Sequence, residues 1–423
     1  MAGRVRRCHH RAAIRKVVIF AVAVGAIFAG SVAFVSVVCR ASARVRMPSR
    51  RPSAEAGARY LHGSRMMRGS TPEGSLAAED AGGARRNVVV GALAVVAFGL
   101  FCKTRLIDGG MDVFSPPAGS LRGRTVVITG GNTGLGFESA VRLARAGATV
   151  VITARTAEKG VKAVEQIKLA SGSSDVHQVQ LDLADLANIK SFPGRYEALP
   201  VGTKIDVLMN NAGVMAIPQR QETKNGFEQQ FGINHLGHFA LVSSVLPLLK
   251  KSEYARVINV SSTASLPATR ELMEGDIMAP ENYTQWGAYV QSKFANVIFA
   301  KELDRRFKAA GVNATAVSLH PGAVDTDLGR WMVGNSDDPR ITKSIQESNP
   351  VLKALTSVTR PVDLGANTQV YLAAGADGGY DKSGGLYFDN MAPAEGNSLA
   401  NDEALAQKIW LDSERLTGVK IDL

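Results

Sequence analysis

The chain has 423 residues and a formal net charge of +11, a length that suits one large α/β domain with an extension or two ordinary domains. Residues 1–86 hold 16 Lys and Arg against four acidic residues, a net of +12, so the remaining residues sum to −1. In a nucleic-acid-binding body the cations would line a groove of the folded domain. Because the excess of Lys and Arg is confined to residues 1–86, the charge distribution argues against a nucleic-acid-binding protein. We therefore expect no nucleic-acid partner.

The cysteines limit the chemistry that residues 103–423 can perform. All three, Cys8, Cys39 and Cys102, lie in the first quarter of the chain, so the remainder can form no disulfide, Cys-ligated zinc site or thiol nucleophile. His235 and His238 have an i, i+3 spacing that could suggest a metal, but no carboxylate or thiol lies near them in sequence. We interpret both as packing residues and predict no metal.

The leader, residues 1–86, contains 23 uncharged residues at 17–39, long enough for a membrane-spanning helix. A signal anchor fits this length best, and a cleaved signal peptide is the alternative because small residues such as Ala41 and Ala43 follow. Residues 40–70 carry eight Arg and one acid, which resembles a transit peptide. The two parts together resemble the leaders of algae with complex plastids. They predict a membrane-associated plastid protein, with the endoplasmic reticulum as the alternative.

A second apolar run precedes the body of the protein. Residues 87–102 are uncharged, between Arg86 and Lys103, and are near the lower length limit for a bilayer span. We predict a membrane anchor here, with a buried or interfacial helix as the alternative. Pro116, Pro117 and Gly119 then mark residues 103–120 as a linker.

Residues 121–423 alternate short β-branched runs with longer amphipathic stretches. The runs include TVVIT, ATVVITA, DVLMN, RVINVSS and NATAVSLH. Strands that alternate with helices indicate βαβ units and a parallel sheet covered on both faces. The sequence therefore predicts a single α/β domain with a doubly wound, Rossmann-type parallel sheet.

A glycine-rich stretch follows the first predicted strand, before a helix expected to begin near Phe137. Its GxxxGxG spacing would let the backbone approach a pyrophosphate, whose charge the helix N-terminus stabilises. A tight strand-to-helix turn without a ligand is the alternative. The residues that we expect to contact a dinucleotide here are Gly130, Asn132, Thr133, Gly134, Leu135 and Gly136.

Arg155 follows the second predicted strand, where an NAD site usually supplies an acid for the ribose 2′-OH. A guanidinium suits a 2′-phosphate instead. Arg155 thus favours NADP(H), and a solvated Arg that leads into a helix is the alternative.

Several further motifs follow in a fixed order along the body. They are Asp182-Leu183, NNAG at 210–213, Asn234, Ser261-Ser262, Tyr289 with Lys293, and Pro321-Gly322. With the glycine loop, this set resembles the short-chain dehydrogenase/reductase family over residues 121–418. Segments such as GGNTGLGFESA and KIWLDSERLTG resemble its retinol dehydrogenase branch.

The resemblance implies a role for each motif. It makes Asn234, Ser262, Tyr289 and Lys293 a catalytic tetrad, with Ser262 preferred over Ser261. Within the tetrad, Tyr289 and Lys293 would also contact the cofactor, Lys293 at the nicotinamide ribose, and Asn234 would help order a proton-relay water. It makes Asp182 and Leu183 adenine contacts. It assigns cofactor support to Asn211, Ala212 and Gly213, and the nicotinamide amide to Pro321, Gly322, Val324 and Thr326.

The spacing and chemistry of Tyr289 and Lys293 also suggest proton transfer without the family resemblance. Four residues apart on a helix, they project from one face. A phenol with a pKa near ~10 is a poor base at neutral pH, and a neighbouring ammonium should lower that pKa. Tyr289 would then serve as a general acid or base. A surface helix pair is the alternative reading of the spacing alone.

The family resemblance implies an NADP(H)-dependent oxidoreductase that interconverts an alcohol and a carbonyl. Its retinol dehydrogenase branch suggests a lipophilic substrate, such as a retinoid, a carotenoid-derived aldehyde or a fatty aldehyde. Residues 327–360 resemble the variable segment that covers the substrate and would determine its identity. The sequence leaves open whether the protein forms a homo-oligomer. One alternative is a protochlorophyllide-reductase-like plastid enzyme, although such enzymes use a cysteine that this body lacks. The other is a membrane-tethered NADP(H)-binding regulatory or scaffold protein.

Overall fold

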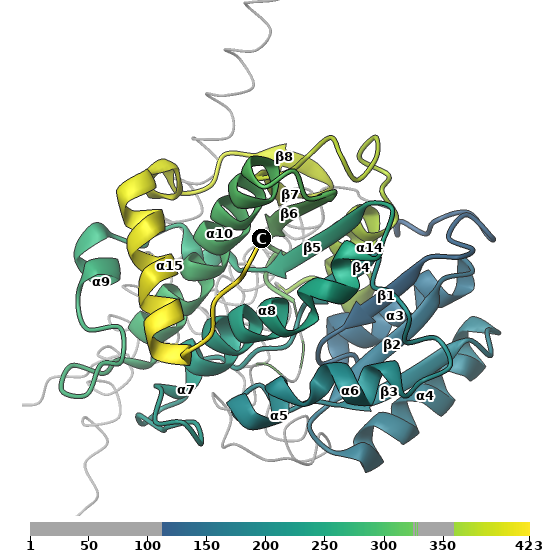
Figure 1. Ribbon diagram of the computed structural model, residues 1–423, viewed down its shortest axis with the longest axis horizontal. Helices are drawn as coiled ribbons and strands as arrows, with labels where there is room; N and C mark the ends of the chain where they lie inside the picture. The colour runs from purple at the N-terminus through teal and green to yellow at the C-terminus, as the bar shows by residue number, and fades with distance from the viewer. Residues whose placement is uncertain (1–111, 325, 327, 329–358) are drawn as a thin grey trace, which may run out of the picture. The chain divides into compact units, whose positions relative to one another are not determined.

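The computed structural model describes residues 112–324, 326, 328 and 359–423 (Figure 1). The predicted leader (1–86), its apolar segment (17–39) and the predicted anchor (87–102) lie outside the described residues. The plastid address and the membrane anchor therefore stay predictions. Residues 112–120, expected as part of a linker, contain no helix or strand but pack against the body through Phe114.

Eight strands of the described chain form one sheet, in the order β3-β2-β1-β4-β5-β6-β7-β8. All neighbours are parallel except β7 and β8. The chain builds outward from β1 to β3, returns beside β1 with β4, and builds outward the other way. The predicted doubly wound sheet is thereby confirmed, with its topological switch point between β1 and β4. The strands are β1 (Thr125–Ile128), β2 (Thr149–Ala154), β3 (Val176–Gln180), β4 (Val207–Asn210), β5 (Ala255–Val260), β6 (Ala314–Leu319), β7 (Tyr387–Asp389) and β8 (Ala392–Ala394).

Helices cover both faces of the sheet (Figure 1). One face packs against α3 (Gly134–Arg145), α4 (Ala157–Ser171), α13 (Val362–Gly365) and α14 (Asn367–Ala373). The other packs against α5 (Leu186–Lys190), α6 (Phe192–Glu197), α8 (Gly237–Lys250) and α10 (Gln285–Ala309), with α15 (Glu403–Thr417) lying on α10. Shorter elements are α7 (Gln229–Phe231), the π-helical turn η2 (Gly232–Leu236), η3 (Thr263–Ser265), α9 (Arg270–Glu274) and η5 (Ser398–Asn401).

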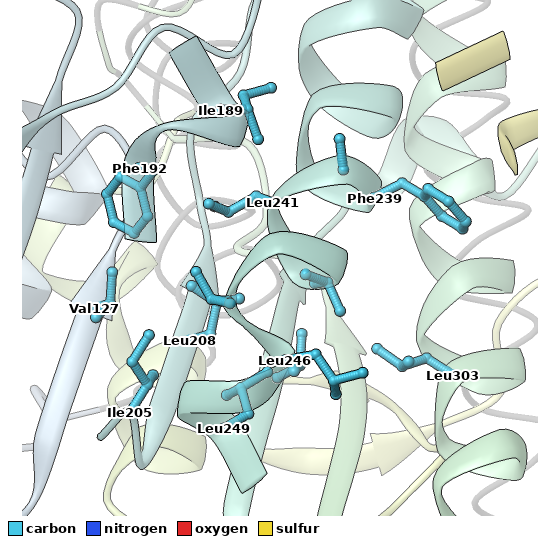
Figure 2. Packing of buried hydrophobic residues seen from close by; sticks show 14 of the residues in the cluster. Val127, Ile189, Phe192, Ile205, Leu208, Phe239, Leu241, Leu246, Leu249 and Leu303 are labelled. Carbon is cyan, nitrogen blue, oxygen red and sulfur yellow. The ribbon is translucent and has the colours of Figure 1, made fainter. Parts of the chain in front are cut away.

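The strands are apolar on both sides because both faces of the sheet are buried. Side chains alternate along a strand, so Val126 and Ile128 join the core beneath α3 and α14, while Val127 joins the opposite core. Figure 2 shows Val127 and Leu208 in this second core, among helix residues such as Phe192 and Leu241. The β-branched runs in the sequence therefore mark central strands.

One apolar helix passes the length and composition test for a membrane span within the part of the chain that the structure describes. It covers Gln229–Lys250, and 83% of its most apolar window is buried inside the body. Such burial identifies a core helix of the fold, since its apolar side chains already pack against protein.

A fully buried guanidinium stabilises the amino end of β5. Arg256 donates from Nη1 to both carboxylate oxygens of Asp377, at 2.9 and 3.0 Å, and from Nη2 to the Gly379 carbonyl at 2.9 Å. Its guanidinium also lies 4.9 Å from the ring centroid of Tyr380. The ion pair ties the segment after α14 to the sheet, far from the carboxyl ends of the strands.

We expect Asp377→Leu to lower the free energy of unfolding by about 3–5 kcal/mol, because it leaves the Arg256 charge buried without its counterion. Urea unfolding followed by circular dichroism measures this loss. The double variant Arg256→Met/Asp377→Leu removes both charges and should regain most of the stability. A single variant as stable as the double variant would contradict this account.

Candidate active site

The predicted site residues gather where parallel strands end at one edge of the sheet. Thr129 follows β1, Asn211 follows β4, Ser262 follows β5, and Pro321 follows β6. We call this the carboxyl edge. In doubly wound sheets, ligands bind outside the carboxyl ends of the strands at the switch point, here between β1 and β4.

The glycine loop between β1 and α3 is packed too closely for larger side chains. A Cβ on Gly136 would lie 2.6 Å from both the Gly130 carbonyl and Asn211 Nδ2, and one on Gly131 would lie 2.5 Å from Ile152. Gly130 also has φ +63°, a region that favours glycine. The helix begins at Gly134, not near Phe137 as predicted, because the loop glycines themselves form its first turn.

The residues between these glycines stay accessible. Thr133 is exposed, and Asn132, Gly134 and Leu135 are partly exposed at the N-terminus of α3. The unpaired backbone N–H groups of a helix's first turn, together with its dipole, favour an anion there. The predicted dinucleotide loop therefore has the geometry that a pyrophosphate needs.

A buried hydroxyl joins this loop to β4. Thr129 Oγ1 accepts from the backbone N–H groups of Asn211 and Ala212, both at 2.9 Å, and lies 2.9 Å from His238 Nε2. Asn211 Nδ2 returns a bond to the Thr129 carbonyl at 2.8 Å. Asn211 and Ala212 are thus held beside the glycine loop, and their predicted support of the cofactor stays a prediction. Thr129 was not among the predicted site residues, although its place between a buried strand and the first glycine could have indicated it.

His238 and His235 are fully buried and engaged in hydrogen bonds. His238 Nδ1 bonds the Asn234 carbonyl at 2.9 Å, and burial lowers the pKa of this ring to about 3. The neutral ring therefore donates through Nδ1 and accepts from Thr129 through Nε2. His235 Nε2 lies 2.8 Å from Ser413 Oγ, and burial lowers its pKa to about 4. These contacts agree with packing roles, and no cluster of three or more metal-ligating side chains occurs among the described residues.

Helix α10 brings Tyr289 and Lys293 to the carboxyl edge. Both side chains are 3% exposed, and Lys293 Nζ lies 5.9 Å from the centroid of the Tyr289 ring. Lys293 Nζ also donates to the Val260 carbonyl at 3.0 Å, at the end of β5. The pair is therefore buried, unlike the surface helix pair that was the alternative reading.

The two serines after β5 have different partners. Ser261 Oγ donates to the Lys293 carbonyl at 2.6 Å, which fastens β5 to α10. The Ser262 hydroxyl accepts from the Ala264 N–H at 3.2 Å and forms a hydrogen bond with Tyr289. This geometry favours Ser262 as the serine of the site.

Burial dominates the protonation of the pair. It raises the pKa of Tyr289 to about 12, and the hydrogen bond from Ser262 offsets only part of that rise. Burial also lowers the pKa of Lys293 to about 8. The expectation that Lys293 lowers the pKa of Tyr289 below its ordinary value is thus wrong for the chain by itself, because burial desolvates the phenolate and is the largest cause of the shift.

Asn234 lies in the π-helical turn η2, and three hydrogen bonds fix its side-chain amide. Its Oδ1 accepts from the Val214 N–H at 2.8 Å, and its Nδ2 donates to the Val214 carbonyl and to Ser292 Oγ, both at 2.9 Å. A Cβ on Gly213 would lie 3.0 Å from Asn234 Oδ1 and 3.4 Å from Lys293 Nζ. Asn234, Gly213 and Lys293 are therefore neighbours, and the relay role expected of Asn234 stays a prediction.

The residues that the resemblance places near the adenine end of the cofactor follow β2 and β3. Arg155 is exposed directly after β2, and its carbonyl accepts from Gln180 Nε2 at 3.0 Å. Asp182 Oδ1 accepts from the Ala184 N–H at 3.0 Å, while Leu183 is buried. All three of Arg155, Asp182 and Leu183 lie at the carboxyl edge, on the β2 and β3 side of the switch point.

The residues after β6 lie beside the glycine loop. Gly322 has φ +83°, Val324 packs against Gly365, and Thr326 Cγ2 lies 3.4 Å from where a Gly134 Cβ would be. The Pro321 to Thr326 stretch therefore returns to the glycine loop, as its predicted nicotinamide role requires. The predicted substrate segment, 327–360, lies outside the described residues except for 328, 359 and 360.

Arg360 is a site residue that the sequence analysis did not single out. Its Nη1 donates to Asn390 Oδ1 at 2.7 Å and to the Pro321 carbonyl at 3.4 Å. Its backbone N–H donates to the Ala323 carbonyl at 2.7 Å. It thereby braces the turn after β6, and no local motif could have shown a contact between residues 39 positions apart.

Known proteins resemble the chain in sequence and structure. The sequence model of the short chain dehydrogenase family matches residues 124–334. Retinol dehydrogenase 13 of Homo sapiens is 36% identical over 305 residues, which cover 72% of this chain and 88% of that protein. Polyprenol dehydrogenase of Mus musculus is 35% identical over 303 residues, which cover 70% and 84%.

A solved structure agrees with these sequence relatives. The crystal structure of an uncharacterised protein from Mycobacterium paratuberculosis is 33% identical, with a TM-score of 0.56, and the match covers 74% of this chain and all of that one. Sequence identity above 30% across most of the relatives' length, together with a shared fold, establishes the family. The chain belongs to the short-chain dehydrogenase/reductase family, in its retinol dehydrogenase-like branch.

Proposed function

We propose that this protein is an NADP(H)-dependent oxidoreductase that interconverts an alcohol and a carbonyl on a lipophilic substrate, with Tyr289 as the acid and base. The observation that carries the proposal is the buried cluster of Ser262, Tyr289 and Lys293 at the carboxyl edge, beside the glycine loop. A buried phenol that is hydrogen-bonded to a serine and faces an ammonium is suited to proton transfer.

The cofactor proposal is supported by the shape and charge of its site. The glycine loop leaves no room for a Cβ at Gly131 or Gly136, which suits a backbone that approaches a pyrophosphate closely. The exposed Arg155 would bind a 2′-phosphate, and no acid stands at the end of β2 to bind a ribose hydroxyl instead. A bound nicotinamide would donate or accept the hydride.

In the reductive direction, the Tyr289 hydroxyl would give its proton to the substrate oxygen as the carbonyl carbon gains the hydride. Ser262 would hydrogen-bond that oxygen and orient it. The phenolate left on Tyr289 would be stabilised by the nearby Lys293 cation, which is largely protonated at neutral pH because its pKa is about 8. In the oxidative direction, the same phenolate would take the proton from the alcohol.

The lipophilic substrate class is supported by the names of two relatives. Retinol dehydrogenase 13 and polyprenol dehydrogenase are named for retinol and polyprenol, which are lipophilic alcohols. Membrane attachment through residues 87–102 would place such an enzyme beside substrates dissolved in a bilayer. No contact among the described residues favours the protochlorophyllide or scaffold alternatives.

Tyr289→Phe should lower kcat for NADPH-dependent aldehyde reduction by about 10²- to 10⁴-fold, because it removes the proton donor while keeping the ring. NADPH binding, followed by fluorescence titration, should weaken far less than turnover, because the Tyr289 ring is kept and Lys293 remains. Tyr254→Phe is the control, since Tyr254 precedes β5 at the opposite edge of the sheet. Tight NADPH binding without turnover by the wild-type protein on any aldehyde or ketone would favour the scaffold alternative.

Arg155→Asp should reduce the preference for NADPH over NADH, measured as the ratio of kcat/KM, by about 10-fold or more. A hydrogen bond to a charged group contributes about 1.5–3 kcal/mol, and the new carboxylate would repel the 2′-phosphate. Lys162→Asp makes the same charge change further along α4 and serves as the control. An unchanged ratio in Arg155→Asp would count against the assignment.

Gly136→Ala should raise the Kd for NADPH by about 10-fold or more, because its Cβ would collide with the Gly130 carbonyl and displace the loop. Gly194→Ala is the matched control, since a Cβ there meets nothing within 4 Å. Equal NADPH affinity in the two variants would show that the glycine loop does not hold the cofactor.

A further inference from the structure

We propose that the neutral imidazole of His320 holds the turn of Pro321 and Gly322 in place, so that acid weakens binding of the nicotinamide half of the cofactor. His320 is thus a positioning residue, which acts through the backbone that follows it. The inference rests on the proposed function, since it concerns the same cofactor and the turn expected to bind its nicotinamide amide. It is carried by the hydrogen bonds of His320, the groups around its ring and the backbone that they fix.

One ring nitrogen of His320 shapes the turn that follows. The Gly322 N–H donates to His320 Nδ1 at 3.1 Å, which closes the turn across two residues. Because Nδ1 accepts this bond, it carries no proton, and the proton of the neutral ring lies on Nε2. The His320 N–H donates to the Phe388 carbonyl at 3.2 Å, next to β7 in the sheet. The ring therefore holds Gly322 against a backbone that the sheet anchors.

The turn has an unusual backbone, which its hydrogen bonds stabilise. Gly322 has φ +83°, in the left-handed region. A Cβ on Gly322 would lie 2.9 Å from Arg360 Nη1, so the guanidinium packs directly on the turn. Arg360 also bonds the carbonyls on either side of Gly322, that of Pro321 through Nη1 and that of Ala323 through its backbone N–H. Arg360 thus satisfies carbonyls of the turn, while His320 satisfies the Gly322 N–H.

The groups around the ring oppose one another over its protonation. His320 Nε2 lies 3.3 Å from Asp389 Oδ1, and the Tyr387 ring packs against the imidazole with 5.7 Å between centroids. Asp389 favours the imidazolium, whereas burial of the ring and the Arg360 cation disfavour it. Burial is the largest of these effects, and the pKa of His320 is lowered from its ordinary value of 6.5. The ring is therefore neutral at neutral pH and gains its second proton in acid.

A second ring proton would break the contact that holds the turn. The imidazolium has a donor at both nitrogens, so two donors would face each other across the 3.1 Å between Gly322 N and His320 Nδ1. The Gly322 N–H would lose its partner, and the turn would shift. The same stretch continues to Thr326, whose Cγ2 lies 3.4 Å from where a Gly134 Cβ would be. A shift here would disturb the nicotinamide side of the site and leave the residues after β2 and β3 in place.

Binding of two ligands to the full chain, measured by isothermal titration calorimetry, tests this. NADP⁺ carries the nicotinamide, and 2′-phospho-ADP-ribose lacks it but keeps the 2′-phosphate, so titration of that phosphate cancels in the ratio of their Kd values. We expect the preference for NADP⁺ to fall by about twofold or more from about pH 7.5 to about pH 5, as loss of one hydrogen bond would cause. A preference that does not change with pH would overturn the proposal.

The conservative variant His320→Asn separates titration of the ring from its packing. An asparagine oxygen can accept the N–H two residues on, as Nδ1 does, and it has no proton to gain at these pH values. His320→Asn should therefore keep the preference for NADP⁺ at both pH values. Asp389→Asn removes the charge that favours the imidazolium and should move the fall to lower pH. A fall in His320→Asn as large as that of the wild type would overturn the proposal.

His320→Leu removes the acceptor and should lower the preference for NADP⁺ at both pH values, with the Kd for 2′-phospho-ADP-ribose unchanged. His177→Leu is the matched control, since His177 on β3 also lies beside a carboxylate, with its Nε2 2.9 Å from Asp175 Oδ1. Equal weakening of both ligands in His320→Leu would overturn the inference while the proposed function stands. The expected binding pattern without turnover of any aldehyde or ketone would keep this role for His320 and remove the proposed reaction.

Discussion

The site depends on one buried hydroxyl at the end of the first strand. Thr129 accepts two N–H groups from the turn after β4 and bonds His238, which in turn holds the Asn234 carbonyl. This short chain of hydrogen bonds joins the glycine loop, the β4 turn and η2 into one unit. In a dry interior each partner must be satisfied, so the network permits only one arrangement of these three segments.

That arrangement sets the electrostatics of the proposed reaction. Fixing β4 and β5 beside α10 buries Tyr289 and Lys293 together, and desolvation favours the neutral form of each group. The pKa of the phenol rises to about 12 and that of the amine falls to about 8. Tyr289 is therefore protonated at neutral pH, as the proposed proton donor must be, and Lys293, still mostly charged, would stabilise the phenolate.

The C-terminal part of the body contributes a turn that is linked through Arg360 to the residues after β6. Asn390 and Met391 both have positive φ, as the two-residue turn between β7 and β8 requires. The Arg360 guanidinium donates hydrogen bonds to Asn390 Oδ1 and to the Pro321 carbonyl. A strained turn stabilised by a buried cation thus positions the backbone after β6, where the nicotinamide amide is expected.

The sequence by itself determined the features that depend on the geometry of a single element. Strand runs, the glycine spacing and the i, i+4 relation of Tyr289 and Lys293 follow from local backbone periodicity, so they predicted the doubly wound sheet, the glycine loop and the Tyr289–Lys293 pair. The other site residues were predicted from the family resemblance of the motifs. Only the tertiary structure decided the direction of the Tyr289 pKa shift and the contacts of Thr129 and Arg360. These depend on burial and on contacts between residues far apart in the sequence, such as Thr129 and His238, which are 109 positions apart. No local pattern records them, because they are set when distant segments pack together.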